Sequence, residues 1–236
     1  MADRKEKIYI ADDDDNIREL IKTFLQSEGY HVIAFSNGEE LLAYFIHEAC
    51  DLVVLDVMMP GRDGFAICME IRKISTVPII FLTAKDTDLD YATGLNLGSD
   101  DYFTKPFSAM SLVMRVKAIF RRIGYERQNI QPSADSGSLT FGDILINEKS
   151  KTVTIAGQDV PLTPNEYGLL RFFVRNGDRA VSRDELLEAV WGFEAEIETR
   201  AADDTIRRLR KKMTGSNVII DAVWGFGFRL KVDAHE

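Results

Sequence analysis

Acidic residues stand directly after two short apolar runs of this sequence. Leu52–Leu55 ends on Asp56, shortly before Pro60 and Gly61, and Ile8–Ala11 ends on the acids Asp12–Asp15. Runs of this length are typical of buried strands of a parallel sheet. The carboxyl ends of such strands meet at one edge, so the carboxylates are expected to converge there. Clustered carboxylates repel one another unless a cation neutralises them, and a site with oxygen ligands suits Mg2+.

Two further predicted strands bring other groups to the same edge. A strand over Val77–Leu82 ends on Thr83, and a short strand around Tyr102 leads to Lys105. A nucleophilic carboxylate, a hydroxyl and an ammonium beside an acidic metal site could accept a phosphoryl group, because that reaction depends mainly on positioning and charge neutralisation. The alternative for any one of these residues is a helix N-cap. Four complementary strand ends favour the phosphoryl-accepting site.

Length and composition limit the class of protein to which this site can belong. The chain has 236 residues, enough for two domains, and its 45% hydrophobic content argues against disorder. The net charge of −9, taken alone, argues against a nucleic-acid partner. Cys50 and Cys68 form no metal-like pair and give little support for a disulfide. No apolar run suits a signal peptide or a membrane span, so we expect a cytoplasmic protein with no membrane partner.

The first half alternates strands with helical patterns. Apolar residues recur at helical spacing after the strands, within 17–25, 41–45 and 65–74, and a remaining strand is expected over 32–35. Five such βα units predict an α/β doubly wound sheet in the flavodoxin-like order. We expect this domain over 1–123 and a linker over 124–137, where apolar periodicity gives way to polar, Pro and Gly residues.

The second half, 138–236, has a different pattern. Strand-like runs over 139–146, 152–155 and 158–162 precede two helices that begin with the capping boxes Thr163–Glu166 and Ser182–Glu185. A third helix, 199–213, combines an apolar stripe with six Lys or Arg, so it is locally positive inside an acidic protein. A hairpin over 217–230 follows, with two glycines at its turn. This layout predicts an α+β winged helix-turn-helix.

Both halves resemble parts of one family. Residues 7–122 resemble the receiver domain of a two-component response regulator, and residues 138–232 resemble the DNA-binding domain of the OmpR/PhoB type, with "RRLRKK" and "WGFGFR" as the matching motifs. The resemblance implies that Asp56 accepts the phosphoryl group. It also implies that Asp13 binds Mg2+ directly, that Asp12 supports the ion through water, and that the backbone carbonyl of Met58 is the third protein ligand.

The resemblance also implies the residues that transmit the signal. Thr83 and Tyr102 resemble the paired switch residues, and Thr83 and Lys105 join Asp56 as the catalytic group of the receiver. Lys105 resembles the lysine that contacts the acyl phosphate, with a cis Lys105–Pro106 bond. A sensor histidine kinase is the implied donor, and receiver homodimerisation the implied result. The output would be regulated binding to double-stranded promoter DNA beside RNA polymerase, without enzymatic turnover.

The expected dimer face lies on the last strand and helix of the receiver. Its candidate residues are Tyr91, Asp100, Asp101, Ser111, Arg115, Lys117 and Arg122. Tyr91 and Ser111 depart from the family pattern, since they stand where an ion pair is usual, so a polar or aromatic contact would replace that pair. A solvated charged face is the alternative, because exposed ion pairs contribute little individually.

Helix 199–213 and the hairpin supply the candidate DNA contacts. They are Arg200, Thr205, Arg207, Arg208, Lys211, Lys212 and Arg229. Arg200, Arg207 and Lys211 share a helix face and could reach phosphates and base edges, with the helix in the major groove and the hairpin on the adjacent minor groove. The alternative is that basic residues merely compensate the helix dipole. Asp204 and Thr205 depart from the family pattern, so no base preference follows.

Two other functional classes fit parts of the sequence. A haloacid-dehalogenase-like phosphatase also uses a strand-end aspartate and Mg2+, but it needs a second acid two residues later, where Met58 stands. A receiver that docks only proteins is favoured slightly by the acidic net charge. Turnover of a small phosphate ester would support the first class, and lack of salt-dependent duplex binding would support the second.

Overall fold

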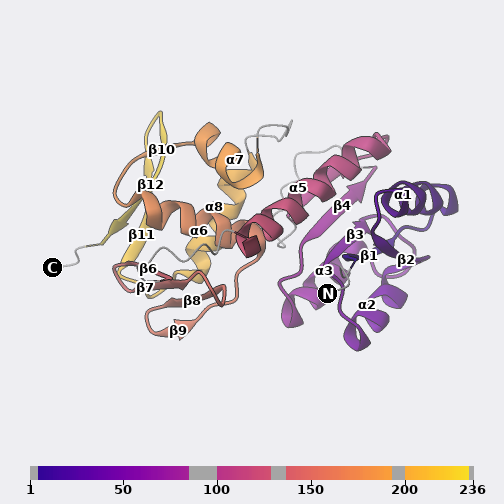
Figure 1. Cartoon of the computed structure of the whole chain (residues 1–236), viewed down its shortest axis with the longest axis horizontal. Helices are drawn as coiled ribbons and strands as arrows, with labels where there is room; N and C mark the ends of the chain where they lie inside the picture. The colour runs from indigo at the N-terminus through magenta and orange to yellow at the C-terminus, as the bar shows by residue number, and fades with distance from the viewer. Residues whose placement is uncertain (1–4, 85–99, 129–136, 193–199, 234–236) are drawn as a thin grey trace. The chain divides into compact units, whose positions relative to one another are not determined.

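The chain forms two compact units, Met1–Lys117 and Ala118–Glu236, each described here by itself (Figure 1). This computed structural model describes residues 5–84, 100–128, 137–192 and 200–233. No helix in these ranges is long and apolar enough to cross a membrane.

The first unit is built on a five-stranded parallel sheet in the order β2-β1-β3-β4-β5. Its strands are β1 (Lys7–Ala11), β2 (His31–Phe35), β3 (Leu52–Asp56), β4 (Ile79–Thr83) and β5 (Asp101–Thr104). Its described helices are α1 (Asp15–Ser27), α2 (Gly38–His47), α3 (Gly64–Ile74) and the start of α5 (Ala109–Gln128). The predicted flavodoxin-like order is confirmed.

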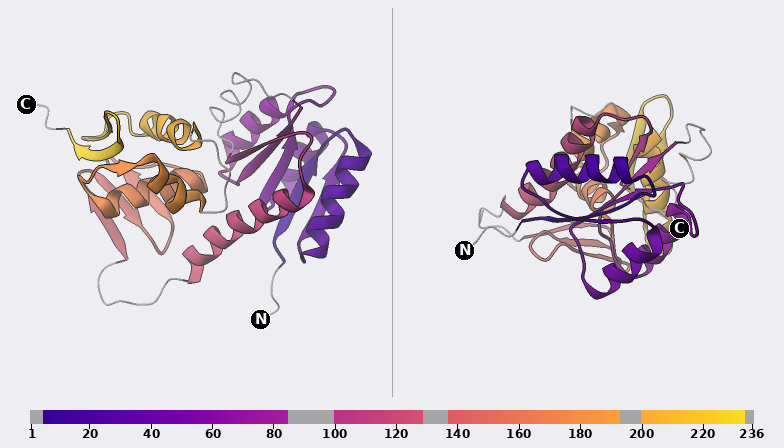
Figure 2. Two further views of the ribbon diagram at one scale, coloured as in Figure 1. Left: turned by 90° about the horizontal axis from the view of Figure 1, so that it is seen from above. Right: turned by 90° about the vertical axis from the view of Figure 1, so that its right-hand side faces the viewer.

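Helices cover both faces of this sheet, with α1 and the start of α5 on one face and α2 and α3 on the other (Figure 2). The α2 and α3 side packs Phe45 and Ile67 against Tyr9, Val53 and other strand residues in one apolar cluster. Every residue of β3 and β4 is buried, which explains their continuous apolar runs.

The N-caps of α1, α2 and α3 are Asp14, Asn37 and Asp63, none of which belongs to the group formed by Asp12, Asp13 and Asp56. Asp14 caps α1 by accepting hydrogen bonds from the backbone N–H groups of Asn16 and Ile17 at 2.8 and 3.3 Å. These bonds hold the pKa of Asp14 below its usual value. Asp63 caps α3 through the N–H of Ala66 at 2.7 Å. Asp14 and Asp63 are thus helix caps, whereas Asp12, Asp13 and Asp56 do not cap a helix and are available for a binding site.

The second unit combines two antiparallel sheets with three described helices. The sheets have the orders β6-β7-β8-β9 and β10-β12-β11. The strands are β6 (Ser138–Phe141), β7 (Ile144–Asn147), β8 (Thr152–Ile155), β9 (Gln158–Asp159), β10 (Val181–Ser182), β11 (Val218–Val223) and β12 (Gly227–Val232). The helices are α6 (Pro164–Asn176), α7 (Arg183–Trp191) and α8 (Arg200–Lys212). Three helices followed by the β11–β12 hairpin confirm the predicted winged layout.

Three local features differ from the sequence expectation. The run 139–146 is two strands rather than one, because Gly142 adopts φ of +57° and turns the chain between β6 and β7. Helix α5 continues to Gln128, into the stretch predicted as linker. Thr163 and Glu166 form the predicted capping box. At the second predicted box, the Glu185 backbone N–H donates to Ser182 Oγ at 3.1 Å, but the Glu185 carboxylate pairs with Arg179.

Candidate phosphoacceptor site and nucleic-acid interface

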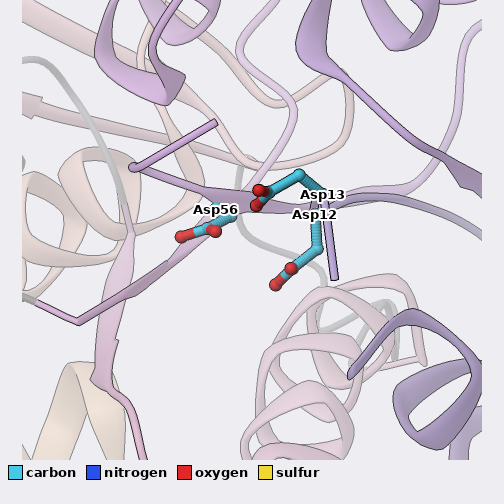
Figure 3. A group of neighbouring side chains, drawn as sticks. All are labelled: Asp12, Asp13 and Asp56. Carbon is cyan, nitrogen blue, oxygen red and sulfur yellow. The ribbon is translucent and has the colours of Figure 1, made fainter. Parts of the chain in front are cut away.

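Three carboxylates meet where β1 and β3 end (Figure 3). Oxygen atoms of Asp12, Asp13 and Asp56 all lie within 4.8 Å of one another, and Asp12 and Asp56 are buried while Asp13 is exposed. β1 and β3 pair in parallel, with Ala11 opposite Leu55, so the residues that follow reach the same sheet edge. The convergence predicted from the strand ends is present.

Lys105 bridges two of these carboxylates. Its Nζ donates to Asp12 Oδ2 at 2.7 Å and to Asp56 Oδ2 at 2.9 Å. Burial alone would lower the pKa of the ammonium, but the hydrogen bonds and charges of the two carboxylates raise it. The Lys105–Pro106 bond is cis, as predicted.

Asp56 is held in an environment that disfavours its charge. Burial raises the pKa of its carboxyl, and the neighbouring Asp12 adds to this rise, while Lys105 and the backbone N–H of Met58 oppose it. The Met58 N–H lies 3.3 Å from Asp56 Oδ1, and the Met58 side chain is exposed.

The donor set fits a hard divalent cation. Three carboxylates face one ammonium, so the cluster keeps an excess of negative charge that Lys105 does not cancel. Oxygen ligands in a partly open cluster suit Mg2+, which retains several waters. An ion there would relieve the repulsion between Asp12 and Asp56.

The backbone behind Asp56 is fixed by a close approach at Gly64. A Cβ at this position would lie 2.2 Å from the backbone oxygen of Asp56, and the Gly64 N–H donates to Val57 O at 3.0 Å. Only glycine allows α3 to begin so near the strand end. Gly64 therefore allows the start of α3 to pack directly against the backbone of Asp56 and Val57 at the end of β3.

The predicted switch residues lie on neighbouring strands. Thr83 ends β4 and is fully buried, and Tyr102 on β5 is half-buried against the apolar cluster that contains Phe81. Phe81 is the β4 partner of Tyr102 in the register.

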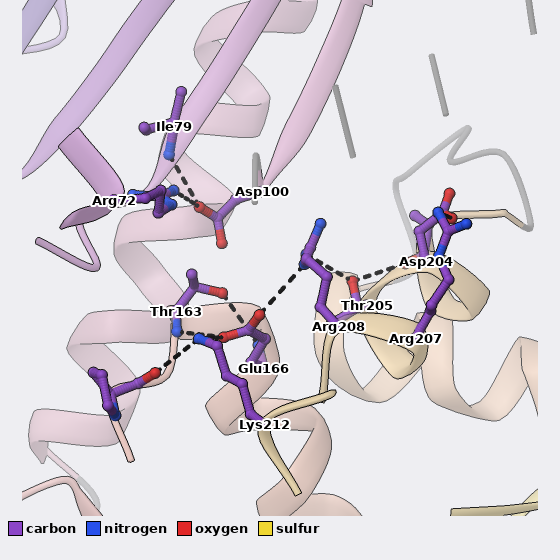
Figure 4. A network of polar contacts seen from close by, with 12 residues as sticks. Arg72, Ile79, Asp100, Thr163, Glu166, Asp204, Thr205, Arg207, Arg208 and Lys212 are labelled. Carbon is purple, nitrogen blue, oxygen red and sulfur yellow. Dashed lines mark hydrogen bonds and ion pairs between the residues drawn. The ribbon is translucent and has the colours of Figure 1, made fainter. Parts of the chain in front are cut away.

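Charged residues of the expected dimer face have partners inside the receiver unit. Asp100 is buried and accepts from Arg72 at 3.2 Å and from the Ile79 N–H at 3.0 Å (Figure 4). Arg115 pairs with Asp101 at 2.7 Å, and Lys117 pairs with Glu28 at 2.6 Å.

The remaining residues of this expected face are placed only in part. Ser111 is exposed on α5, between the exposed Met110 and Met114. Tyr91 and the side chain of Arg122 lie outside the described residues.

The predicted DNA-contact residues of α8 divide between two faces. Arg208 is buried, and its Nε lies 3.3 Å from Glu166 Oε1. Thr205 is also buried, and its hydroxyl donates to Ala201 O at 2.8 Å. Lys212 donates to Glu166 Oε2 at 2.6 Å (Figure 4). Arg208 and Lys212 therefore join α8 to α6, and Thr205 and Arg208 are buried rather than on the solvent-exposed face where DNA contacts were expected.

Arg207 and Lys211 lie on the exposed face of α8. Arg207 pairs with Asp204 of its own helix at 2.6 Å, and Lys211 has no carboxylate partner among the described residues. Arg229 on β12 lies 3.4 Å from Asp221. The side chain of Arg200 lies outside the described residues. The exposed part of the predicted set thus comprises Arg207, Lys211 and the partly exposed Arg229.

Sequence reasoning missed two arginines that join α8 to the hairpin. Arg210 donates to Ile220 O of β11 at 2.7 and 3.0 Å, and its guanidinium lies over the ring of Phe228 at 5.7 Å. Arg183 lies over the same ring at 4.8 Å and pairs with Asp203 of α8. The clue in the sequence is Phe228, an inward-facing aromatic in a hairpin beside a basic helix.

Comparisons with known proteins agree with this geometry. Residues 8–117 match the family described as "Response regulator receiver domain", and residues 157–230 match "Transcriptional regulatory protein, C terminal". The chain is 38% identical over 229 residues to the "Uncharacterized transcriptional regulatory protein YclJ" of Bacillus subtilis, covering 96% of this chain and 100% of the relative. It is 36% identical to "Transcriptional regulatory protein ResD" of the same organism, covering 97% of each chain.

A solved structure gives the same result. The response regulator DrrB, a Thermotoga maritima OmpR/PhoB homolog, is 32% identical with a TM-score of 0.51, over 96% of this chain and 99% of that chain. The chain belongs to the two-component response regulators of the OmpR/PhoB type. It is a phosphorylation-regulated, DNA-binding transcriptional regulator.

Proposed function

We propose that Asp56 accepts a phosphoryl group from a sensor histidine kinase. The observation that carries this proposal is the cluster of three carboxylates within 4.8 Å, two of them bridged by Lys105. An Asp56 oxygen would attack phosphorus while the P–N bond of the kinase's phosphohistidine breaks and the histidine leaves. Lys105, already 2.9 Å from Asp56 Oδ2, would then pair with a phosphoryl oxygen.

Mg2+ would be the cofactor of this step, held by Asp12, Asp13, Asp56 and the backbone carbonyl of Met58. It would neutralise charge that develops on the phosphoryl oxygens. The excess of carboxylates over ammonium groups supports this assignment.

Phosphorylation would then act through Thr83 and Tyr102. The Thr83 hydroxyl would move to the phosphoryl group, and Tyr102 would move further into the space beside Phe81. We propose that this shift remodels β5 and α5 so that two receivers pair. The face would include Ser111, with Asp101, Arg115 and Lys117 exchanging internal partners for partners on the second copy. The exposed Met110 and Met114 would supply apolar area to the contact.

The second unit would bind double-stranded promoter DNA through α8 and the hairpin. Arg207, Lys211 and Arg229 would contact phosphates and base edges, with Arg200 and Lys212 at the ends of the helix. Receiver pairing would place two such units on repeated half-sites and raise affinity through effective concentration. RNA polymerase is the expected downstream partner.

We further infer that the chain acts in the cytoplasm as a regulator rather than as an enzyme. The domain limits we propose are 1–123 for the receiver, 124–137 for the linker and 138–236 for the DNA-binding domain.

A mobility-shift experiment with the protein's own upstream DNA tests the proposal. Wild type and Asp56→Asn are compared with and without a small-molecule phosphodonor plus Mg2+. The expected result is tighter binding only for treated wild type. Equal tightening in Asp56→Asn would contradict the role of Asp56. Arg207→Ala is the second arm, and unchanged affinity in that variant at near-physiological salt would contradict the role of α8.

A further inference from the structure

The exposed face of α8 carries an acid among its cations. Asp204 Oδ1 accepts a hydrogen bond from Arg207 Nη2 at 2.6 Å, one turn further along the same helix (Figure 4). The Arg207 side chain is 47% exposed and the Asp204 side chain 14% exposed, so the pair presents mainly its guanidinium to solvent. The exposed Lys211 follows one turn later. A carboxylate at this point weakens the positive field that a phosphate backbone would meet, so its presence needs a reason.

Helix stability gives little reason for Asp204. Its neighbour Asp203 lies in the first turn of α8, where the helix dipole favours an acid, and pairs through both carboxylate oxygens with Arg183 of α7. Asp204 lies beyond that turn, and Arg207 is its one ion-pair partner among the residues that the structure describes. An ion pair between neighbouring turns of one helix contributes little to stability. Asp203 therefore has a structural role, and Asp204 is free to serve another.

The pair restricts how Arg207 can bind. An unrestrained arginine samples many rotamers, and ordering it costs free energy on binding. The bond to Asp204 holds one Nη atom of Arg207 and leaves the remaining N–H groups of the planar fork to a partner. In the major groove, guanine presents O6 and N7 as two acceptors that fit such a fork. The carboxylate repels phosphate oxygens, so it disfavours contacts of Arg207 that carry no sequence information.

We propose that Asp204 is a specificity-determining residue of α8, which positions Arg207 to read a guanine and lowers affinity for non-specific duplex. The inference rests on the proposed DNA-binding function of the second unit and adds to it a base and the residue that selects it. Asp204 acts through Arg207 and is a positioning residue. Removal of this acid should therefore give a protein that binds more DNA sequences, with less discrimination.

Selection from random-sequence duplexes tests the base preference. The full-length protein, treated with phosphodonor and Mg2+, is used as wild type, Arg207→Lys and Asp204→Ala. Arg207→Lys keeps the charge but not the planar fork, so the base pair at which it loses a guanine preference identifies the Arg207 contact. Asp204→Ala is expected to lower the guanine preference at that same base pair by about tenfold, the discrimination given by one bidentate contact. Preferences at other base pairs should stay.

Affinity for a duplex that lacks the selected sequence is the second readout. Asp204→Ala is expected to bind it about threefold more tightly at low salt, because a charge of the same sign as the phosphates is removed from the contact face. Glu188→Ala is the matched control, since Glu188 is exposed on α7 and its loss changes the net charge equally. It should leave the guanine preference unchanged and alter non-specific affinity less. Both alanine variants should fold, because alanine favours helix.

The outcomes separate this inference from the proposed function. An unchanged guanine preference in Asp204→Ala, at a base pair that Arg207→Lys does alter, would overturn the role of Asp204 while DNA binding by α8 stands. Arg207→Lys without any change of base preference would overturn the guanine contact itself. A wild type that enriches no sequence would also overturn the inference, and lack of salt-dependent binding to any duplex would overturn the proposed function with it.

Discussion

The two units each contain a small group of buried charges, and the two groups are built in opposite ways. In the receiver, one cation, Lys105, lies between two carboxylates, with Asp13 as a third acid. In the winged unit, one carboxylate, Glu166, lies between the cations Arg208 and Lys212. The first group has three carboxylates against one ammonium and opens to solvent through Asp13. In the second group, Glu166 and Arg208 are buried between helices as a one-to-one pair, and the additional cation, Lys212, is partly exposed.

The two groups suggest two roles for buried charge, a binding site in the receiver and a helix–helix contact in the winged unit. Unbalanced charge costs stability unless a ligand or ion completes it, so it marks a site for chemistry. Balanced charge with good hydrogen bonds can fix the relative position of two helices. Glu166 therefore positions α8, whereas the carboxylate cluster of the receiver has the excess negative charge expected of a cation-binding site.

The largest expected effect is the loss of the central carboxylate in the balanced group. Glu166→Gln leaves Arg208 buried without its counter-charge, and should lower the free energy of unfolding by about 3 kcal/mol. Urea unfolding followed by tryptophan fluorescence measures this, since Trp191 and Trp224 both belong to the second unit.

Glu148→Gln is the matched control for that variant. Glu148 also contacts two cations, Arg171 and Arg175, but it lies nearer the surface. Its loss should cost less than about 1 kcal/mol. Equal losses in the two variants would break the distinction between a buried structural group and a surface pair.

A somewhat smaller effect is expected from the backbone behind the receiver site. Gly64→Ala places a Cβ 2.2 Å from the backbone oxygen of Asp56, so the β3–α3 connection must shift. We expect a loss of about 2 kcal/mol by circular dichroism in urea, together with slower phosphorylation.

Gly168→Ala on α6 is the control for the glycine change. Its Cβ would meet Val190 at 3.5 Å, an ordinary contact, so it should raise stability by up to about 1 kcal/mol, as alanine does in a helix interior. A harmless Gly64→Ala would show that the site does not depend on this close approach.

Neutralising one carboxylate of the unbalanced group should have the opposite sign to Glu166→Gln. Asp56→Asn removes a desolvated charge beside Asp12, so in metal-free buffer it should stabilise the receiver by about 1 kcal/mol. Mg2+ at tenfold its dissociation constant should stabilise wild type by about 1.4 kcal/mol and should stabilise the variant less. Sodium chloride at matched ionic strength is the control, and destabilisation by Asp56→Asn would refute the charge excess.

The smallest expected effect is the pH dependence of stability that comes from the buried thiol of Cys50. Burial raises the pKa of its thiol from 9.0 to about 12. A raised folded-state pKa means that its contribution to stability is complete below pH 9 and is lost as pH rises. Between pH 9 and 10 the unfolded thiol ionises while the folded one stays neutral, so stability should fall by about 0.5–1 kcal/mol. Cys50→Ala should flatten this decline in urea unfolding, and an unchanged slope in that variant would exclude the thiol as its cause.

The strand ends of the receiver could be predicted from sequence because short apolar runs followed by acids have few other structures available. Asp12, Asp56 and Lys105 came together as expected. The role of Glu166 could be predicted only as a cap, since its ion-pair partner Lys212 lies 46 residues away and no local pattern links them.

The buried face of α8 is wider than the apolar stripe that the spacing of its hydrophobic residues predicted. Arg208 lies beside the apolar stripe formed by Ala202, Ile206 and Leu209, and that stripe is wide enough to bury Thr205 and Arg208 as well. A basic side chain at the edge of a buried stripe needs an acid across the interface, which sequence alone does not locate.

The bridge from Lys105 to Asp12 spans 93 residues of chain, and its bridge to Asp56 spans 49. During synthesis, the acids are therefore complete well before their lysine emerges from the ribosome. A nascent or proteolysed fragment that ends before β5 carries Asp56, the proposed phosphoacceptor, without the lysine that contacts it. If Asp56 accepts the phosphoryl group as proposed, the receiver must therefore be complete through β5 before Lys105 can pair with that group.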